Sequence, residues 1–110
     1  MKLRNLLIAA LGVTALAGAA GAASAETPWQ AHHPRRVEVN HRLDNLNRSI
    51  THERREGDIS GRRAALMHAH VHHIRMQERR YAAFHGGHIS RYEQARLNHE
   101  ENGVRRHIPG

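Results

Sequence analysis

Cysteine is absent from the 110-residue chain, and lysine occurs only once, as Lys2. The absence of cysteine excludes a scaffold held together by disulfides. Large apolar side chains are also scarce, because Leu, Ile, Val and Phe account for only 14 of the 85 residues after Ala25. This content falls below the level of roughly 20% at which highly charged chains often fail to bury a core, so we expect a thin core. These shortages exclude a multidomain protein and disfavour an enzyme with a deep pocket.

Arginine and histidine are the abundant residue types. The chain has 12 His, and its formal net charge is +7 with every imidazole neutral. Free imidazoles take up protons near pH ~6.5, so the positive charge of such a chain rises steeply between neutral and mildly acidic pH. We therefore expect acid to increase self-repulsion, to strengthen attraction to anions and to loosen the fold.

The N-terminal segment has the pattern of a secretory signal. A basic start precedes an apolar run over Leu6–Ala17, and small residues follow up to Ala25. The run is too short to span a bilayer, which needs ~20 apolar residues. No cysteine follows that could carry a lipid anchor. We therefore expect a signal peptide over 1–25, cleavage between Ala25 and Glu26, and a periplasmic or secreted protein.

The rest of the chain predicts a flexible leader over 26–33 and an all-α domain over 34–110. Apolar residues recur at helical spacing in three segments that begin near Pro34, Ser60 and Ser90. The first line contains Val39, Leu43, Leu46 and Ile50; the second contains Ala64, Met67, Val71, Ile74 and Tyr81; the third contains Leu97, Val104 and Ile108. Three amphipathic helices in one chain favour a small helical bundle.

Glycines punctuate the predicted helices. Gly57 ends the first, and the Gly86–Gly87 pair ends the second. Glu93, three residues after Ser90, gives the third helix the sequence of a capping box. The Asn102–Gly103 pair is expected to fray or break that helix.

The four-residue segment that begins at the last glycine of each stop repeats after 30 residues. Gly57-x-Ile59-Ser60 matches Gly87-x-Ile89-Ser90. The repeat predicts two overlapping helix-loop-helix units that share the middle helix. The alternative is a coincidence between two similar helix starts.

Gly-x-Ile-Ser before a helix resembles the second half of an EF-hand loop. In that register Gly57 and Gly87 take the glycine position of the loop, and Glu93 takes the final carboxylate position. The positions that would supply the other ligands or the first loop's last carboxylate hold His52, Arg54, Glu56, Arg63, Ala82, Phe84 and Gly86. The resemblance therefore implies a turn geometry of degenerate EF-hand type and no calcium binding.

Two further resemblances concern exported proteins. The segment His33–Asn45, together with Gly86–Ser90, resembles a group of small exported proteobacterial helical proteins, which implies a shared helical fold. Ile59–Arg63 and Ile89–Glu93 are loosely similar to the L-T-x-x-Q segments of Spy and CpxP-type periplasmic stress proteins, but both lack the glutamine. That likeness implies a protein that holds anionic or unfolded clients against its arginines.

The densest chemistry lies between Met67 and Met76. On a helix, His68 and His72 project from one face one turn apart, which makes a two-imidazole chelate. Imidazole suits zinc, nickel and copper(II), and a thioether adds a preference for copper(I). The candidate ligands are His68, His72, His70, His73, Met67 and Met76. Two ligands on one helix would form an open, exchangeable site, so we expect low-affinity transition-metal binding or buffering.

Other interpretations of these residues remain open. The histidines can be solvated, and the arginine pairs can bind envelope phosphates or unfolded clients. Homodimerisation can occur through the apolar lines. We expect no enzyme, because no nucleophile has an oriented base, and no sequence-specific binding of nucleic acid.

Three glutamates fall on the extended apolar lines. They are Glu53, Glu78 and Glu101. Because an unpaired buried charge is costly, we expect each to find an arginine or histidine partner. The alternative role is to complete a histidine metal site.

Overall fold

The computed structural model describes residues 25–110, and the protein is all-α over that range. Its helices are α2 (Pro28–His32), α3 (Pro34–Arg55), α4 (Gly61–Phe84) and α5 (Arg91–Arg106). The predicted fold class is therefore confirmed, with three long helices. The predicted signal peptide lies outside the described residues except for Ala25. None of the helices described combines the length and the apolar character that a membrane crossing requires.

The predicted leader contains the short helix α2. Thr27 Oγ1 accepts a hydrogen bond of 3.1 Å from the backbone of Gln30, and Gln30 Oε1 accepts one of 2.8 Å from the backbone of Thr27. This reciprocal pair satisfies two backbone N–H groups at the start of the helix. The sequence pattern did not reveal α2, because five residues are too few for an apolar line to repeat.

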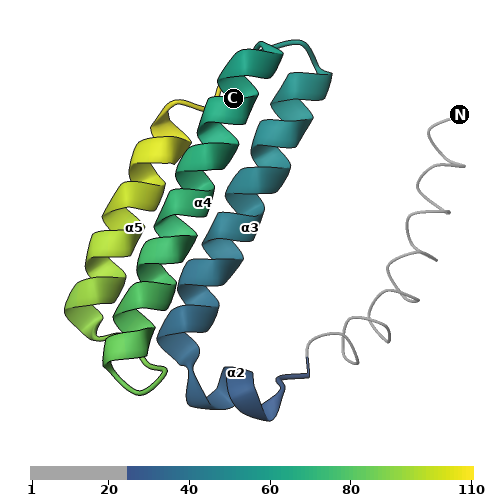
Figure 1. Cartoon of the computed structure of the whole chain (residues 1–110). Coiled ribbons are helices and arrows are strands. Elements are labelled where there is room, and N and C mark those ends of the chain that lie inside the picture. The colour runs from purple at the N-terminus through teal and green to yellow at the C-terminus, as the bar shows by residue number, and fades with distance from the viewer. Residues whose placement is uncertain (1–24) are drawn as a thin grey trace, which may run out of the picture. The chain divides into compact units, whose positions relative to one another are not determined.

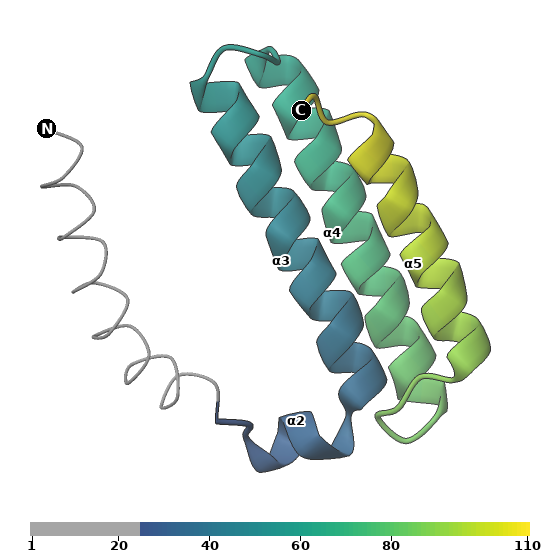
Figure 2. The same ribbon diagram turned by 180° about the vertical axis from the view of Figure 1, so that it is seen from behind.

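The three long helices lie side by side in Figures 1 and 2, and each contacts both of the others. Short loops make α4 antiparallel to α3 and to α5, so α3 and α5 run in the same direction. The predicted apolar lines meet between them. The buried apolar residues are Val39, Leu43, Leu46, Ile50, Ile59, Ala64, Met67, Val71, Ile74, Ala82, Ile89, Leu97 and Val104. One chain therefore buries most of these lines within itself, with Tyr81 and Ile108 partly buried at the edge of the core.

The two loops show why Gly-x-Ile-Ser recurs. Gly57 has a φ of 81° and Gly87 a φ of 94°, which other residues rarely adopt. Ile59 and Ile89 follow them into the core, from loops at opposite ends of α4. A helix of 24 residues is ~36 Å long. The two isoleucines therefore do not pair with each other as their counterparts in paired EF-hand loops do.

Serine side chains begin both later helices, as predicted. Ser60 Oγ accepts a hydrogen bond of 3.0 Å from the backbone of Arg63. Ser90 and Glu93 form the complete capping box, with bonds of 3.1 and 2.8 Å. The expected break at Asn102–Gly103 does not occur, and α5 continues to Arg106.

Candidate metal-binding site

The six predicted metal ligands lie on α4 but do not converge. Met67 is buried in the core, His68 is half-buried, and His70, His72, His73 and Met76 are exposed. Over residues 25–110, no three or more His, Asp or Glu side chains are arranged to hold a metal ion. A site within this part of the chain would rest on two imidazoles, completed by a thioether, water or a second molecule.

His68 is held against α3. Its Nδ1 lies 2.8 Å from Asn47 Oδ1, and its Nε2 lies 3.5 Å from Thr51 Oγ1. An amide oxygen only accepts, so Nδ1 donates and the neutral ring keeps a lone pair on Nε2. Because α3 and α4 are antiparallel, Thr51 lies on the side of His68 away from His72. To chelate with His72, the His68 ring would have to leave Asn47.

His72 and Met76 are exposed and lie one helical turn apart on α4. His73 is exposed as well. These side chains form the solvent face of the histidine-rich segment. Their imidazole and thioether groups have the chemistry of transition-metal ligands.

A hollow of about 350 Å³ lies where α4 meets the end of α5. Two of the predicted ligands, Met67 and His70, line it together with His107 from the end of α5. The other lining residues are Arg63, Leu66 and Val104. In this hollow the imidazole of His107, at the end of α5, joins the predicted ligands Met67 and His70 of α4.

His107 is the candidate ligand that sequence reasoning missed. Its Nδ1 lies 2.8 Å from the backbone oxygen of Gly103, so Nδ1 donates and Nε2 keeps the lone pair when the ring is neutral. Metal-binding histidines commonly hold their second ring nitrogen in this way, which fixes the tautomer and the ring orientation. The turn at Gly87 could have indicated His107. His70 and His107 lie at similar sequence distances on either side of that turn, and two antiparallel helices bring such residues to the same level.

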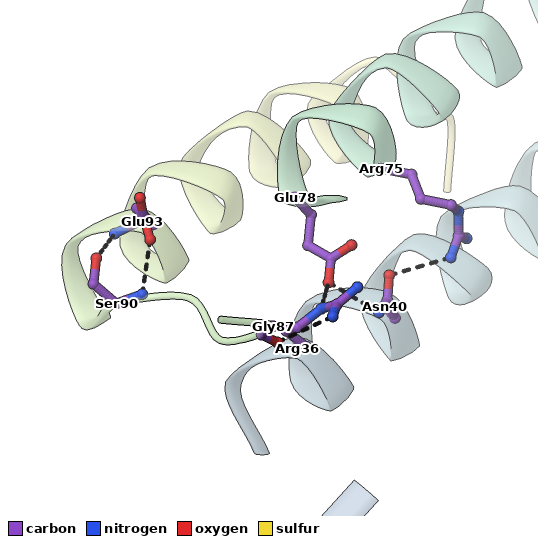
Figure 3. A network of polar contacts seen from close by, with 7 residues as sticks. All are labelled: Arg36, Asn40, Arg75, Glu78, Gly87, Ser90 and Glu93. Atoms are coloured by element: carbon purple, nitrogen blue, oxygen red, sulfur yellow. Dashed lines mark hydrogen bonds and ion pairs between the residues drawn. The ribbon is translucent and has the colours of Figure 1, made fainter. Parts of the chain in front are cut away.

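The buried glutamates are not part of this hollow. Glu78, only 1% exposed, accepts hydrogen bonds from Arg36 and, at 3.4 Å, from Asn40 Nδ2. Arg36 also donates to the backbone oxygen of Gly87 at 3.1 Å, and Asn40 Oδ1 accepts from Arg75 at 3.2 Å. Figure 3 shows this network joining α3, α4 and the turn before α5. The predicted ion pairing is confirmed for Glu78, which acts as a structural residue.

Glu101 on α5 has a less complete environment. Its Oε1 lies 3.4 Å from Arg42 Nε, and its side chain is 1% exposed. Both carboxyl oxygens lack a hydrogen-bond partner. Burial raises the pKa of Glu101 to about 8, although Arg42 opposes that shift. The carboxyl group is therefore largely protonated at neutral pH.

Glu53 is the third glutamate on an apolar line, and it lies at the edge of the core. Its side chain is 15% exposed, and His52 Nε2 is 3.9 Å from its carboxylate. A hydrogen bond with Asp58 raises the pKa of Glu53. It contributes no ligand to the histidine-rich segment of α4.

Comparison of the chain with protein-family models, with curated proteins and with solved structures found no match.

Proposed function

We propose that this protein binds copper, nickel or zinc ions with low affinity in the periplasm, through the hollow between α4 and α5. The observation that supports this function most strongly is the position of His107. Its ring shares the hollow with His70 and Met67, and its Nδ1 hydrogen bond directs the lone pair to Nε2. Two imidazoles and one thioether suit copper(I) better than zinc or nickel.

The proposed site is open and incomplete. Three protein ligands leave at least one coordination position to water or another molecule, which is typical of exchangeable rather than structural sites. Arg63 also lines the hollow and disfavours a cation there. Both features lower the affinity, as buffering requires. His68, His72, His73 and Met76 would provide weaker, secondary positions along α4.

Calorimetric titration of the purified protein with copper(I), copper(II), nickel(II) and zinc(II) tests the proposal. We expect copper(I) to bind most tightly and His70→Ala/His107→Ala to weaken it by roughly tenfold or more, because two of three ligands are lost. The matched control is His41→Ala/His99→Ala, which removes two exposed histidines that do not line the hollow. Equal affinity in the two double variants would exclude the hollow as the site.

The His68→Ala/His72→Ala variant separates this site from the chelate predicted by helical spacing. Retained copper(I) binding in this variant supports the hollow. Loss of binding here, with retention in His70→Ala/His107→Ala, would assign the ion to the His68–His72 face instead.

A Spy-like role in holding anionic or unfolded clients is the second candidate. It is favoured by the exposure of eleven arginines over residues 25–110. These are Arg48, Arg54, Arg55, Arg62, Arg63, Arg79, Arg80, Arg91, Arg96, Arg105 and Arg106. Delayed aggregation of an unfolded client that is insensitive to metal and to histidine removal would support this role.

Two finer assignments belong to the same proposal. Export with cleavage between Ala25 and Glu26 predicts that protein recovered from a bacterial periplasmic extract begins at Glu26, which N-terminal sequencing can check. The matching Gly-x-Ile-Ser turns support two overlapping helix-loop-helix units that share α4.

A further inference from the structure

The C-terminal ends of α3 and α5 lie together, and an open hollow of about 700 Å³ lies between them. Its charged and titratable lining residues are Arg48, His52, Glu53, Arg105 and Arg106, and Ser49, Ile108, Pro109 and Gly110 complete it. Three guanidinium groups therefore face one carboxylate side chain in this hollow. None of these residues belongs to the metal-binding hollow described above.

A second hollow of about 430 Å³ adjoins the first. Arg48 and His52 line both, and Arg55 lines the second together with Asn47 and Thr51. The two hollows therefore meet at Arg48 and His52, and cationic side chains from α3 and α5 line them. We call this surface the basic groove.

The C-terminal ends of α3 and α5 carry partial negative charge, which opposes the positive charge of the arginines on this surface. The C-terminus of a helix carries a partial charge of roughly −0.5, so α3 and α5 together contribute about −1. The four arginines of the basic groove outweigh that partial charge and Glu53 combined. The surface therefore has a net attraction for anions.

The hydrogen bonds within the groove leave donors for a ligand. Arg105 Nη1 donates to Ser49 Oγ at 3.2 Å, and Arg48 donates to Asn45 Oδ1. Each guanidinium has five N–H donors, so both retain most of their capacity. Arg48 and Arg106 are exposed to solvent. Guanidinium groups from two helices can approach different oxygens of a tetrahedral phosphate.

We propose that the basic groove binds a short oligophosphate, an anion with two or more linked phosphate groups. One phosphate group is much smaller than the main hollow, whereas linked phosphates can meet arginines of both helices, with Arg48 lining both hollows. Linked phosphates also carry more charge per unit length than carboxylates do. This inference is independent of the proposed metal function, because the two sites share no residue.

The test is a calorimetric and NMR titration of the protein with sodium tripolyphosphate at fixed ionic strength. The buffer is first freed of metal ions, so a failed metal proposal does not affect the result. We expect saturable binding, with the largest amide shifts around Arg48, His52 and Arg105. Raising the salt concentration should weaken binding, because the groove is open to solvent.

The site variant is Arg48→Gln/Arg106→Gln, and the matched control is Arg62→Gln/Arg79→Gln. Both remove two exposed arginines and change the net charge equally, but only the first pair lines the groove. We expect the site variant to bind tripolyphosphate about tenfold more weakly and the control to lose less than about threefold. A thermal melt of each variant checks that the fold is retained.

Two results would overturn the proposal. Equal losses in the site and control variants would show that tripolyphosphate responds only to net charge. Citrate binding as tightly as tripolyphosphate would show a general anion surface without the assigned preference for linked phosphates.

Discussion

Arg42 Nε lies 3.4 Å from Glu101 Oε1, yet neither carboxyl oxygen of Glu101 has a hydrogen-bond partner. Arg42 donates instead to Asn102 Oδ1, and its Nη1 lies 3.7 Å from the carboxylate of Glu38. One turn before Glu101, the buried Asn98 Oδ1 also lacks a donor. Because burial raises the pKa of Glu101 to about 8, we infer that Glu101 is a neutral acid in the fold.

Because Glu101 is protonated in the fold, its deprotonation in mild alkali should make the folded state less stable. The pKa is raised from 4.5 to about 8, so this group's stabilising contribution is complete below pH 4.5 and is lost as pH rises through 8. Glu38 and Glu100 act in the same direction as burial, and Arg42 and Arg75 oppose it. The histidines act oppositely, because their charging in acid increases self-repulsion. We therefore expect the free energy of unfolding to be largest at a pH above the range in which the histidines become charged and below the pKa of Glu101.

Glu101→Gln keeps the shape of the neutral acid and cannot ionise. We expect it to stabilise the fold by ~1–3 kcal/mol above pH 8.5, where the wild type buries an unsatisfied carboxylate. Near pH 5 the difference should almost vanish. Chemical denaturation at both pH values measures the effect, with the exposed Glu56→Gln as control. A Glu101→Gln variant no more stable than wild type at pH 8.5 would contradict the neutral-acid assignment.

The ion pair between Arg36 and Glu78 should respond asymmetrically to substitution. Arg36→Met leaves the carboxylate of Glu78 with only the 3.4 Å contact to Asn40, so we expect a loss of roughly 3–5 kcal/mol. Arg36→Met/Glu78→Leu removes both charges and should recover most of that loss. Urea unfolding of the two variants gives the comparison. If the double variant were less stable than Arg36→Met, apolar replacement would not satisfy this part of the core.

The two serine caps should differ in their contributions. Ser60→Ala removes one side-chain hydrogen bond, to the backbone of Arg63, and we expect a cost of ~1 kcal/mol. Ser90→Ala also disrupts the reciprocal bond pair with Glu93, so its cost should be larger. Thermal unfolding measures both. Ser60→Thr and Ser90→Thr, which retain the hydroxyl, serve as controls and should cost less than the alanines.

Gly103 provides a stabilising substitution. It lies inside α5 without a positive φ, and an added Cβ would meet only the end of the Arg106 side chain, at 3.7 Å. Gly103→Ala should therefore stabilise the fold by up to ~1 kcal/mol, because alanine favours a helix interior. Gly57→Ala is the contrasting variant, since a φ of 81° strains any side chain, and it should destabilise the fold.

Sequence alone predicted the three long helices closely, because their apolar spacing, serine caps and glycine stops agree with one another. It also put Glu53, Glu78 and Glu101 on the apolar lines, and of these Glu78 and Glu101 are buried while Glu53 lies at the edge of the core. The predicted helix break at Asn102–Gly103 was wrong, because α5 continues to Arg106. The packing of Leu97 and Val104 on either side of it outweighs the ~1 kcal/mol that an interior glycine costs.

The candidate site was less predictable than the fold. Helical spacing placed His68 and His72 on one face but could not show that Asn47 holds the His68 ring. Nor could it show that His107 and His70 line the same hollow, because that depends on the register between two antiparallel helices. Side-chain hydrogen bonds across helices are set by tertiary packing, which a periodic pattern does not contain.

Each buried carboxyl group lies within ion-pair distance of an arginine of α3, Glu78 of α4 beside Arg36 and Glu101 of α5 beside Arg42. The hairpin of α4 and α5 alone would therefore expose its apolar surface and also leave Glu78 without its ion-pair partner Arg36. Such a fragment should not persist as an independent module, so folding is expected to be an all-or-none event for the three helices.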